Sequence, residues 1–228
     1  MVRVKICCIH SIGEALLAVR LGASAVGLVS EMPSGPGVIP ETDITEIAMA
    51  VPPPIATFLL TSKTAADEII AQQMRCRVNT LQLCDRVDAA VHAELRASLP
   101  GISLVQVIHV SGEASVAESV LAARGVDALL LDSGNQSLPV KELGGTGRTH
   151  DWTLSARIVR ESPVPVFLAG GLNPANVGEA IRAVRPFGVD LCTGVRTANS
   201  LDEQKLSRFM AAVAASASSH PQRIVPAR

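Results

Sequence analysis

Residues 164–195 read VPVFLAGGLNPANVGEAIRAVRPFGVDLCTGV and contain a strand pattern, a glycine turn, a helix pattern and a second strand pattern. The apolar run at 164–168 lacks the polar–apolar alternation of a half-exposed strand, so we expect both of its faces to be buried. Residues 175–185 have helical spacing, and 188–192 are again mostly apolar. A strand, a helix and a strand in this order predict a parallel βαβ unit.

The same alternation runs through the whole chain. Strand-like runs rich in Val, Ile and Leu occur at residues 2–7, 25–29, 55–60, 80–83, 103–109, 128–131, 164–168 and 188–192. Segments with helical spacing occur at residues 11–21, 41–50, 64–74, 90–99, 114–124, 153–161, 175–185 and 202–215. Eight such units, each of about 25 residues, predict a single α/β domain, the (β/α)8 TIM barrel. An open doubly wound sheet is the alternative, but its first strand usually leads into a glycine-rich turn, and this chain has Cys7-Cys8-Ile9-His10 there.

Three segments define the expected domain organisation. The barrel is expected to occupy residues 1–216. Residues 217–228 carry His-Pro and Val-Pro pairs without periodicity, which predicts a loose C-terminal tail. Residues 132–151 are too long for an ordinary strand-to-helix turn, so we expect a mobile active-site loop there.

Composition excludes several classes of function. Of the 228 residues, 48% are hydrophobic and 18% charged, which is typical of a folded chain with a large core. The 20 Lys and Arg balance 21 Asp and Glu, and aromatic residues make up only 2%, so we expect no nucleic-acid partner. No apolar run reaches the length of a membrane span, so we expect no membrane partner either.

The five cysteines, at positions 7, 8, 76, 84 and 192, are odd in number and form no CxxC pair. The first residues, MVRVKICC, enter a strand pattern without a secretory signal pattern. Together these features predict a reduced, cytoplasmic protein. Cys7 and Cys8 cannot both point inward from one strand, and no His, Cys or Asp cluster has the spacing of metal ligands, so we expect no metal.

Glycine turns follow the last two predicted strands. Ala169-Gly170-Gly171-Leu172 ends the seventh strand, and Cys192-Thr193-Gly194-Val195 ends the eighth. In TIM barrels the loops after strands seven and eight often bind phosphate, because glycine lets backbone N–H groups approach the anion. We therefore expect a phosphate site at Gly170, Gly171, Thr193 and Gly194. The alternative is that these glycines only form tight turns.

Cys7 and Asp132 follow strands one and six, and both are expected at the carboxyl-terminal mouth of the barrel. A thiol and a carboxylic acid could form a base and acid that move a proton between carbons of a sugar. The base requires a lowered thiol pKa, for which Lys5 is a candidate cation on the same strand face, whereas burial against Leu130 and Leu131 would keep Asp132 protonated. Alternatively, Cys7 is an inert buried residue and Asp132 caps a turn.

Several further polar or glycine residues are expected to surround the substrate. His109 ends the fifth strand, although a lone histidine is more often structural. The candidate residues of these substrate-side loops are Gln82, Cys84, His109, Gly145, Gly147 and Arg196.

Taken together, these motifs resemble the phosphoribosylanthranilate isomerase family, the aldose–ketose (Amadori) isomerases of tryptophan biosynthesis. The resemblance runs from Val4 to about Phe209. Its motifs are Lys5-Ile6-Cys7 with Ile9, Leu81-Gln82-Leu83, Leu130-Leu131-Asp132, Gly144-Gly145-Thr146-Gly147 with Asp151-Trp152, Leu168-Ala169-Gly170-Gly171-Leu172 with Asn176-Val177, and Val189-Asp190 leading into Thr193-Gly194-Val195.

The resemblance implies conversion of N-(5-phosphoribosyl)anthranilate to 1-(2-carboxyphenylamino)-1-deoxyribulose 5-phosphate. Cys7 would be the general base at C2′, and Asp132 the general acid at the ring oxygen. The substrate phosphate would lie on Gly170, Gly171, Thr193 and Gly194. The family implies a small-molecule phosphorylated sugar substrate, no cofactor, and a monomer or homodimer.

The chain also departs from the family pattern around the anthranilate. Pro36 replaces the usual arginine after the second strand, and Cys8 replaces the glycine after the base. The strand-four motif ends in Cys84-Asp85 instead of His-Gly, and Arg196 replaces a glutamate. Arg196 or Arg148 could supply a replacement cation. Two alternatives therefore stay open: a diverged isomerase of another phosphorylated aminopentose, and a noncatalytic phosphosugar-binding barrel.

Overall fold

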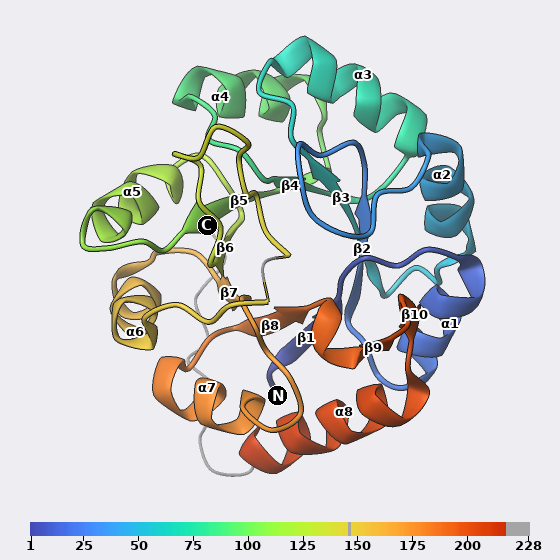
Figure 1. Cartoon of the computed structure of the whole chain (residues 1–228). Coiled ribbons are helices and arrows are strands. Elements are labelled where there is room, and N and C mark those ends of the chain that lie inside the picture. Colours follow the sequence, from blue (N-terminus) through green and yellow to red (C-terminus); the bar gives the residue numbers. More distant parts are fainter. Residues whose placement is uncertain (146, 218–228) are drawn as a thin grey trace.

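The computed structural model describes residues 1–145 and 147–217, in which eight parallel strands close into a barrel surrounded by helices (Figure 1). Consecutive strands are neighbours, and β8 pairs with β1 to close the sheet. The predicted TIM barrel is confirmed, and the open doubly wound sheet is excluded. The strands are β1 (Arg3–Ile6), β2 (Ala25–Val29), β3 (Ala56–Thr61), β4 (Thr80–Leu83), β5 (Ser103–His109), β6 (Ala128–Asp132), β7 (Val166–Leu168) and β8 (Gly188–Leu191).

The helices lie between the strands in sequence and outside them in space (Figure 1). None of the described helices combines the length and apolar character needed to span a membrane. Helix α8 continues to Ala217, one residue into the segment predicted as a tail, and residues 218–228 lie outside the described residues. The helices are α1 (Ile12–Arg20), α2 (Glu41–Ala50), α3 (Ala66–Cys76), α4 (Ala89–Ser98), α5 (Ala114–Ala122), α6 (Trp152–Glu161), α7 (Val177–Val184) and α8 (Glu203–Ala217).

Local sequence signals set several helix boundaries. The Ser11 side chain accepts a hydrogen bond from the Glu14 N–H at the start of α1, and Asp151 does the same for the Thr153 N–H at the start of α6. The first orphan N–H groups of these helices are thereby satisfied. Helix α3 ends where Arg77 adopts a left-handed conformation with φ 55°.

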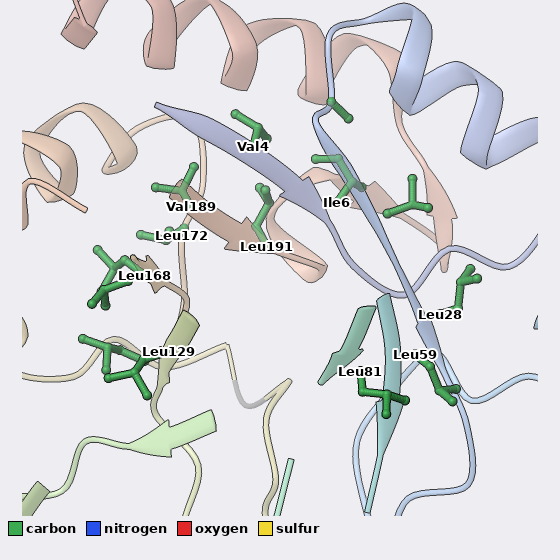
Figure 2. Close-up of a cluster of buried hydrophobic side chains, with 14 of the residues drawn as sticks. Val4, Ile6, Leu28, Leu59, Leu81, Leu129, Leu168, Leu172, Val189 and Leu191 are labelled. Carbon is green, nitrogen blue, oxygen red and sulfur yellow. The ribbon is translucent and has the colours of Figure 1, made fainter. Parts of the chain in front are cut away.

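Side chains alternate along the strands between an outward apolar layer and an inward layer that also contains the polar residues Lys5, Gln82 and Asp190. Outward residues pack against the helices, and Figure 2 shows part of this layer with Val4 and Ile6 of β1 near Val189 and Leu191 of β8. Inward residues such as Phe58 and Leu130 fill the barrel. Burial on both faces explains why strands such as β2 and β6 lack polar alternation in the sequence.

Two loops meet over the carboxyl end of the barrel. The segment 133–150 follows β6 and folds back on itself through a bridge between Asn135 and Glu142. It contacts the loop after β2, where the Ser34 hydroxyl donates to the Lys141 carbonyl over 2.7 Å. The predicted mobility of this segment stays a prediction, and Thr146 within it lies outside the described residues.

Candidate active site

A pocket opens at the carboxyl ends of the barrel strands, beneath the loops after β2 and β6. It brings together Cys7, Asp132, Gly170, Gly171 and Thr193, although they are spread over most of the sequence. The lining residues that the argument uses are Cys7, Cys8, Met32, Pro36, Gln82, Cys84, Asp132, Leu143, Gly145, Gly147, Gly170, Gly171, Asp190, Cys192 and Thr193.

Cys7 is the first residue after β1, and its backbone N–H still donates to the Leu191 carbonyl of β8 over 2.8 Å. This bond fixes the backbone of Cys7 at the mouth of the barrel, with its side chain buried. Burial raises the pKa of the Cys7 thiol to about 11, although the Lys5 ammonium acts in the opposite direction. The thiol is therefore held in place, with the Lys5 ammonium available to stabilise the thiolate.

Asp132 is the last residue of β6 and reaches the same pocket. Its Oδ1 accepts a hydrogen bond from the Ser133 N–H over 2.7 Å, which orients the carboxyl group. Burial raises its pKa, and the Ser133 N–H and His109 partly oppose that shift. A Cβ on Gly144 would lie 2.7 Å from Asp132 Oδ2, so the loop after β6 covers the carboxyl group closely. These conditions favour the protonated form that a general acid needs.

The two glycine turns lie on the other side of the pocket. Gly170 and Gly171 have φ of 85° and 62°, which L side chains rarely adopt, and a Cβ on Gly171 would lie 2.9 Å from the Arg148 backbone. The Asn176 side chain donates to the Gly171 carbonyl over 3.0 Å and fixes the turn. Gly194 packs so closely that a Cβ would lie 2.1 Å from the Leu172 carbonyl oxygen. The glycines are thus needed for the turns. Gly170, Gly171 and Thr193 line the pocket, whereas Gly194 is not among its lining residues.

The pocket includes four of the six predicted substrate-side residues, namely Gln82, Cys84, Gly145 and Gly147. Gln82 Nε2 lies 3.8 Å from Cys84 Sγ, while Gln82 Oε1 is buried with no hydrogen-bond partner among the described residues. A buried acceptor without a partner is costly unless a ligand satisfies it. Gln82 therefore offers an acceptor to a hydroxyl or N–H of a bound molecule.

The other two, His109 and Arg196, lie outside the pocket wall. His109 Nε2 lies 3.0 Å from the Cys84 carbonyl oxygen, behind the wall. Arg196 belongs to the hairpin of β9 (Arg196–Thr197) and β10 (Ser200–Leu201), and its NH2 pairs with Glu14 Oε2 of α1 at 2.7 Å. The hairpin turns this side chain towards α1, which periodicity could not show for strands of two residues.

No arginine or lysine lines the pocket within the described parts of the chain. Arg148 forms an ion pair with Glu142 in the loop after β6, and Lys141 pairs with Asp85. Neither Arg196 nor Arg148, the two candidates to replace the family arginine, therefore lines the part of the pocket expected to hold the anthranilate group. The walls there are formed by Met32, Pro36 and Leu143, with the glycines of the β6 loop.

Cys8 and Cys192 form a disulfide that joins the end of β1 to the end of β8, with their Cα atoms 5.7 Å apart. The expectation of fully reduced cysteines is wrong for this pair. Both Cys7 and Cys8 line the pocket, because β1 ends at Ile6 and Cys8 turns the chain with φ 59°. Closure of the barrel makes β1 and β8 neighbours, so the predicted fold could have indicated this pairing.

Comparisons with known proteins agree with this geometry. A sequence model of the family described as N-(5'phosphoribosyl)anthranilate (PRA) isomerase matches residues 4–212. N-(5'-phosphoribosyl)anthranilate isomerase 2 of Methanosarcina mazei is 35% identical over 210 residues, which cover 91% of this chain and 92% of that protein.

Solved structures give the same result. Phosphoribosyl anthranilate isomerase from Thermus thermophilus superposes with a TM-score of 0.79 at 26% identity, covering 93% of this chain and 98% of that one. A phosphoribosyl anthranilate isomerase in complex with reduced 1-(o-carboxyphenylamino)-1-deoxyribulose 5-phosphate gives a TM-score of 0.76 at 27% identity, covering 94% and 100%. The chain is thus a (β/α)8-barrel enzyme of the aldose–ketose isomerase class. Within that class, it belongs to the N-(5'-phosphoribosyl)anthranilate isomerase family.

Proposed function

We propose that this protein isomerises N-(5-phosphoribosyl)anthranilate to 1-(2-carboxyphenylamino)-1-deoxyribulose 5-phosphate, with Cys7 as general base and Asp132 as general acid. The observation that supports this most strongly is that Cys7, Asp132 and the turn residues Gly170, Gly171 and Thr193 line one pocket. Each group is supplied by a different strand end, as in other enzymes with this fold. The pocket therefore combines a proton acceptor, a proton donor and a place for an anion.

In the proposed reaction the substrate phosphate binds at the turns of Gly170–Gly171 and Thr193–Gly194. Asp132 protonates the ring oxygen so that the sugar ring opens, and the Cys7 thiolate removes the proton from C2′. The resulting enolamine becomes the keto product when C1′ gains a proton and the C2′ hydroxyl group loses one. Binding of the phosphate, which does not react, holds C2′ and the ring oxygen in place between the two groups. Gln82 Oε1 is positioned to accept a hydrogen bond from the sugar.

The aglycone side supports a second candidate function. The anthranilate ring fits the apolar wall of Met32, Pro36 and Leu143, but its carboxylate meets no arginine or lysine among the described lining residues. A pocket without this cation favours a less acidic aglycone, so isomerisation of another phosphorylated aminopentose is the alternative. The acid, the base and the phosphate site would be the same.

Substitution of Pro36 by arginine tests the aglycone side. We expect Pro36→Arg to lower KM for the anthranilate substrate by about 10- to 100-fold, because a guanidinium–carboxylate pair contributes about 1.5–3 kcal/mol. Steady-state kinetics measures the effect. Pro36→Met is the matched control, since it also removes the proline ring and adds a long side chain without charge. An equal KM in both variants would show that the carboxylate does not face this loop.

Fluorescence-monitored turnover of freshly generated phosphoribosylanthranilate tests the proposed function. Turnover at a kcat/KM ordinary for enzymes, of about 10⁴ M⁻¹s⁻¹ or more, is the expected result. No turnover, with inorganic phosphate still raising the melting temperature, would favour the other aminopentose or a noncatalytic barrel. If the protein showed no turnover and phosphate did not raise its melting temperature, the assignment of the pocket itself would be contradicted.

A further inference from the structure

We propose that Lys5 is a positioning residue that supplies the cation for the Cys7 thiolate, and that Asp190 limits this stabilisation because it holds the same ammonium group. The inference rests on the proposed role of Cys7 as the base. It assigns a function to a buried ion pair that neither donates nor accepts a proton in the proposed reaction.

Lys5 and Asp190 meet inside the barrel because of strand register. Lys5 on β1 pairs directly with Asp190 on β8, and Lys5 Nζ lies 2.9 Å from Asp190 Oδ1. Lys5 is 0% exposed, so its charge is not screened by bulk water. Burial alone would lower its pKa, but Asp190, Cys7 and Cys84 outweigh that effect and raise it to about 12. The ammonium is therefore charged throughout the working pH range.

The thiol of Cys7 lies next to this ammonium. Lys5 and Cys7 are two residues apart on the β1 segment, so their side chains point to the same face. A Cβ on Gly27 of β2 would lie 2.8 Å from Cys7 Sγ and 3.0 Å from Lys5 Nζ. Because Gly27 has no Cβ, the Cys7 sulfur and the Lys5 nitrogen can both occupy the small space beside it. The ammonium also lies 5.2 Å from the centre of the Phe58 ring, which closes the space from the side of β3.

The Lys5 ammonium faces several acidic groups in this part of the barrel. The residues of β2 and β3 that lie beside the ammonium, Gly27 and Phe58, are uncharged. The titratable groups that interact with Lys5 or Cys7 are Asp190 of β8, Cys84 after β4 and Asp132 of β6, with His109 of β5 beyond Asp132.

Competition for this ammonium predicts opposite effects of the two partners. Loss of the Asp190 charge removes an anion near the thiol and leaves Lys5 free to stabilise the thiolate, so the pKa of Cys7 falls. Loss of the Lys5 charge removes the cation, so the pKa of Cys7 rises. If the ion pair were purely structural, its loss would destabilise the fold in both variants, and the pKa of Cys7 would not shift in opposite directions.

The test is the pH dependence of Cys7 alkylation by iodoacetamide, followed by peptide mass spectrometry. The measurements use a Cys8→Ser/Cys192→Ser background, so that Cys7 is the single thiol on its peptide. Asp190→Asn is expected to move the alkylation midpoint to lower pH and Lys5→Met to higher pH. A change of one pKa unit alters the thiolate population tenfold and the rate at pH 8 by about threefold, after the change in thiolate nucleophilicity is included.

Two further variants keep the result interpretable. Lys5→Met/Asp190→Leu replaces the buried pair by apolar side chains, which proteins often tolerate. It should also raise the midpoint, because Lys5 acts on the pKa of the Cys7 thiol more strongly than Asp190 does. Asp85→Asn removes a carboxylate at the same barrel end that pairs with Lys141, and should leave the midpoint unchanged. Altered access to Cys7 would change the rate by one factor at every pH without moving the midpoint.

Unchanged midpoints in the Asp190→Asn and Lys5→Met/Asp190→Leu variants would overturn the proposal, as would shifts of the same sign in the two single variants. Failure of the proposed function is seen separately, as full activity of Cys7→Ala. The alkylation midpoints would still report the electrostatic relation between Lys5 and Cys7 in that case.

Discussion

Cys7→Ala is expected to lower kcat for phosphoribosylanthranilate by about 100- to 10,000-fold, the range that a positioned general base contributes. The thiol is held at the end of β1 by the bond from its N–H to Leu191, and alanine keeps that backbone while removing the sulfur. The same loss is expected for Asp132→Asn, because the amide cannot donate a proton to the ring oxygen. Stopped-flow or steady-state fluorescence measures both.

Cys76→Ala is the matched control for the thiol. Cys76 is also free and buried, but it ends α3 away from the pocket, so its loss should leave kcat unchanged. Stabilisation of both active-site variants by inorganic phosphate should also persist, since the glycine turns are intact. If Cys7→Ala retained more than a tenth of the wild-type kcat, the sulfur would not be the base.

Loss of the Cys8–Cys192 disulfide is expected to reduce the free energy of unfolding by about 5 kcal/mol. The bond joins residues separated by 184 positions, and closing so long a loop restricts the unfolded chain strongly. In the folded barrel it ties the ends of β1 and β8, the two strands that close the sheet. Chemical denaturation of Cys192→Ala and of the wild type, both without reductant, measures the difference.

Reductant provides the control for this prediction. Dithiothreitol should lower the unfolding midpoint of the wild type towards that of Cys192→Ala, and should leave the variant unchanged. The oxidised, denatured protein should expose three titratable thiols, those of Cys7, Cys76 and Cys84. Five titratable thiols, or a wild-type midpoint insensitive to reductant, would contradict the bond.

The fold could be predicted from the sequence because the strands carry an unusually clear signal. Burial on both faces gives strands such as β2 and β6 nearly continuous apolar runs, and β2, β4 and β5 have the bounds that their residue patterns predict. The hairpin of β9 and β10 could not be found this way, because two-residue strands have no period. Arg196 was therefore expected near the substrate, whereas it pairs with Glu14 of α1.

The site residues that lie at strand ends were predictable from the sequence, whereas the contacts set by the register between β8 and β1 were not. Cys7, Asp132 and the glycine turns lie at the ends of strands, so their convergence follows from the barrel alone. The contact of Lys5 with Asp190 and the bond between Cys8 and Cys192 depend on how β8 meets β1. Lys5 and Asp190 are separated by 185 positions in the sequence, and Cys8 and Cys192 by 184, so no local sequence pattern indicates that they are paired.

A crystal structure with reduced 1-(o-carboxyphenylamino)-1-deoxyribulose 5-phosphate, the ligand of one related structure, tests the central claim most directly. We predict its phosphate within hydrogen-bond distance of the backbone N–H groups of Gly171 and Gly194. The sugar carbon C2′ should lie beside Cys7 Sγ, with Asp132 on the side of the opened ring oxygen. A phosphate bound away from these turns, or a C2′ atom out of reach of Cys7, would contradict the proposed reaction.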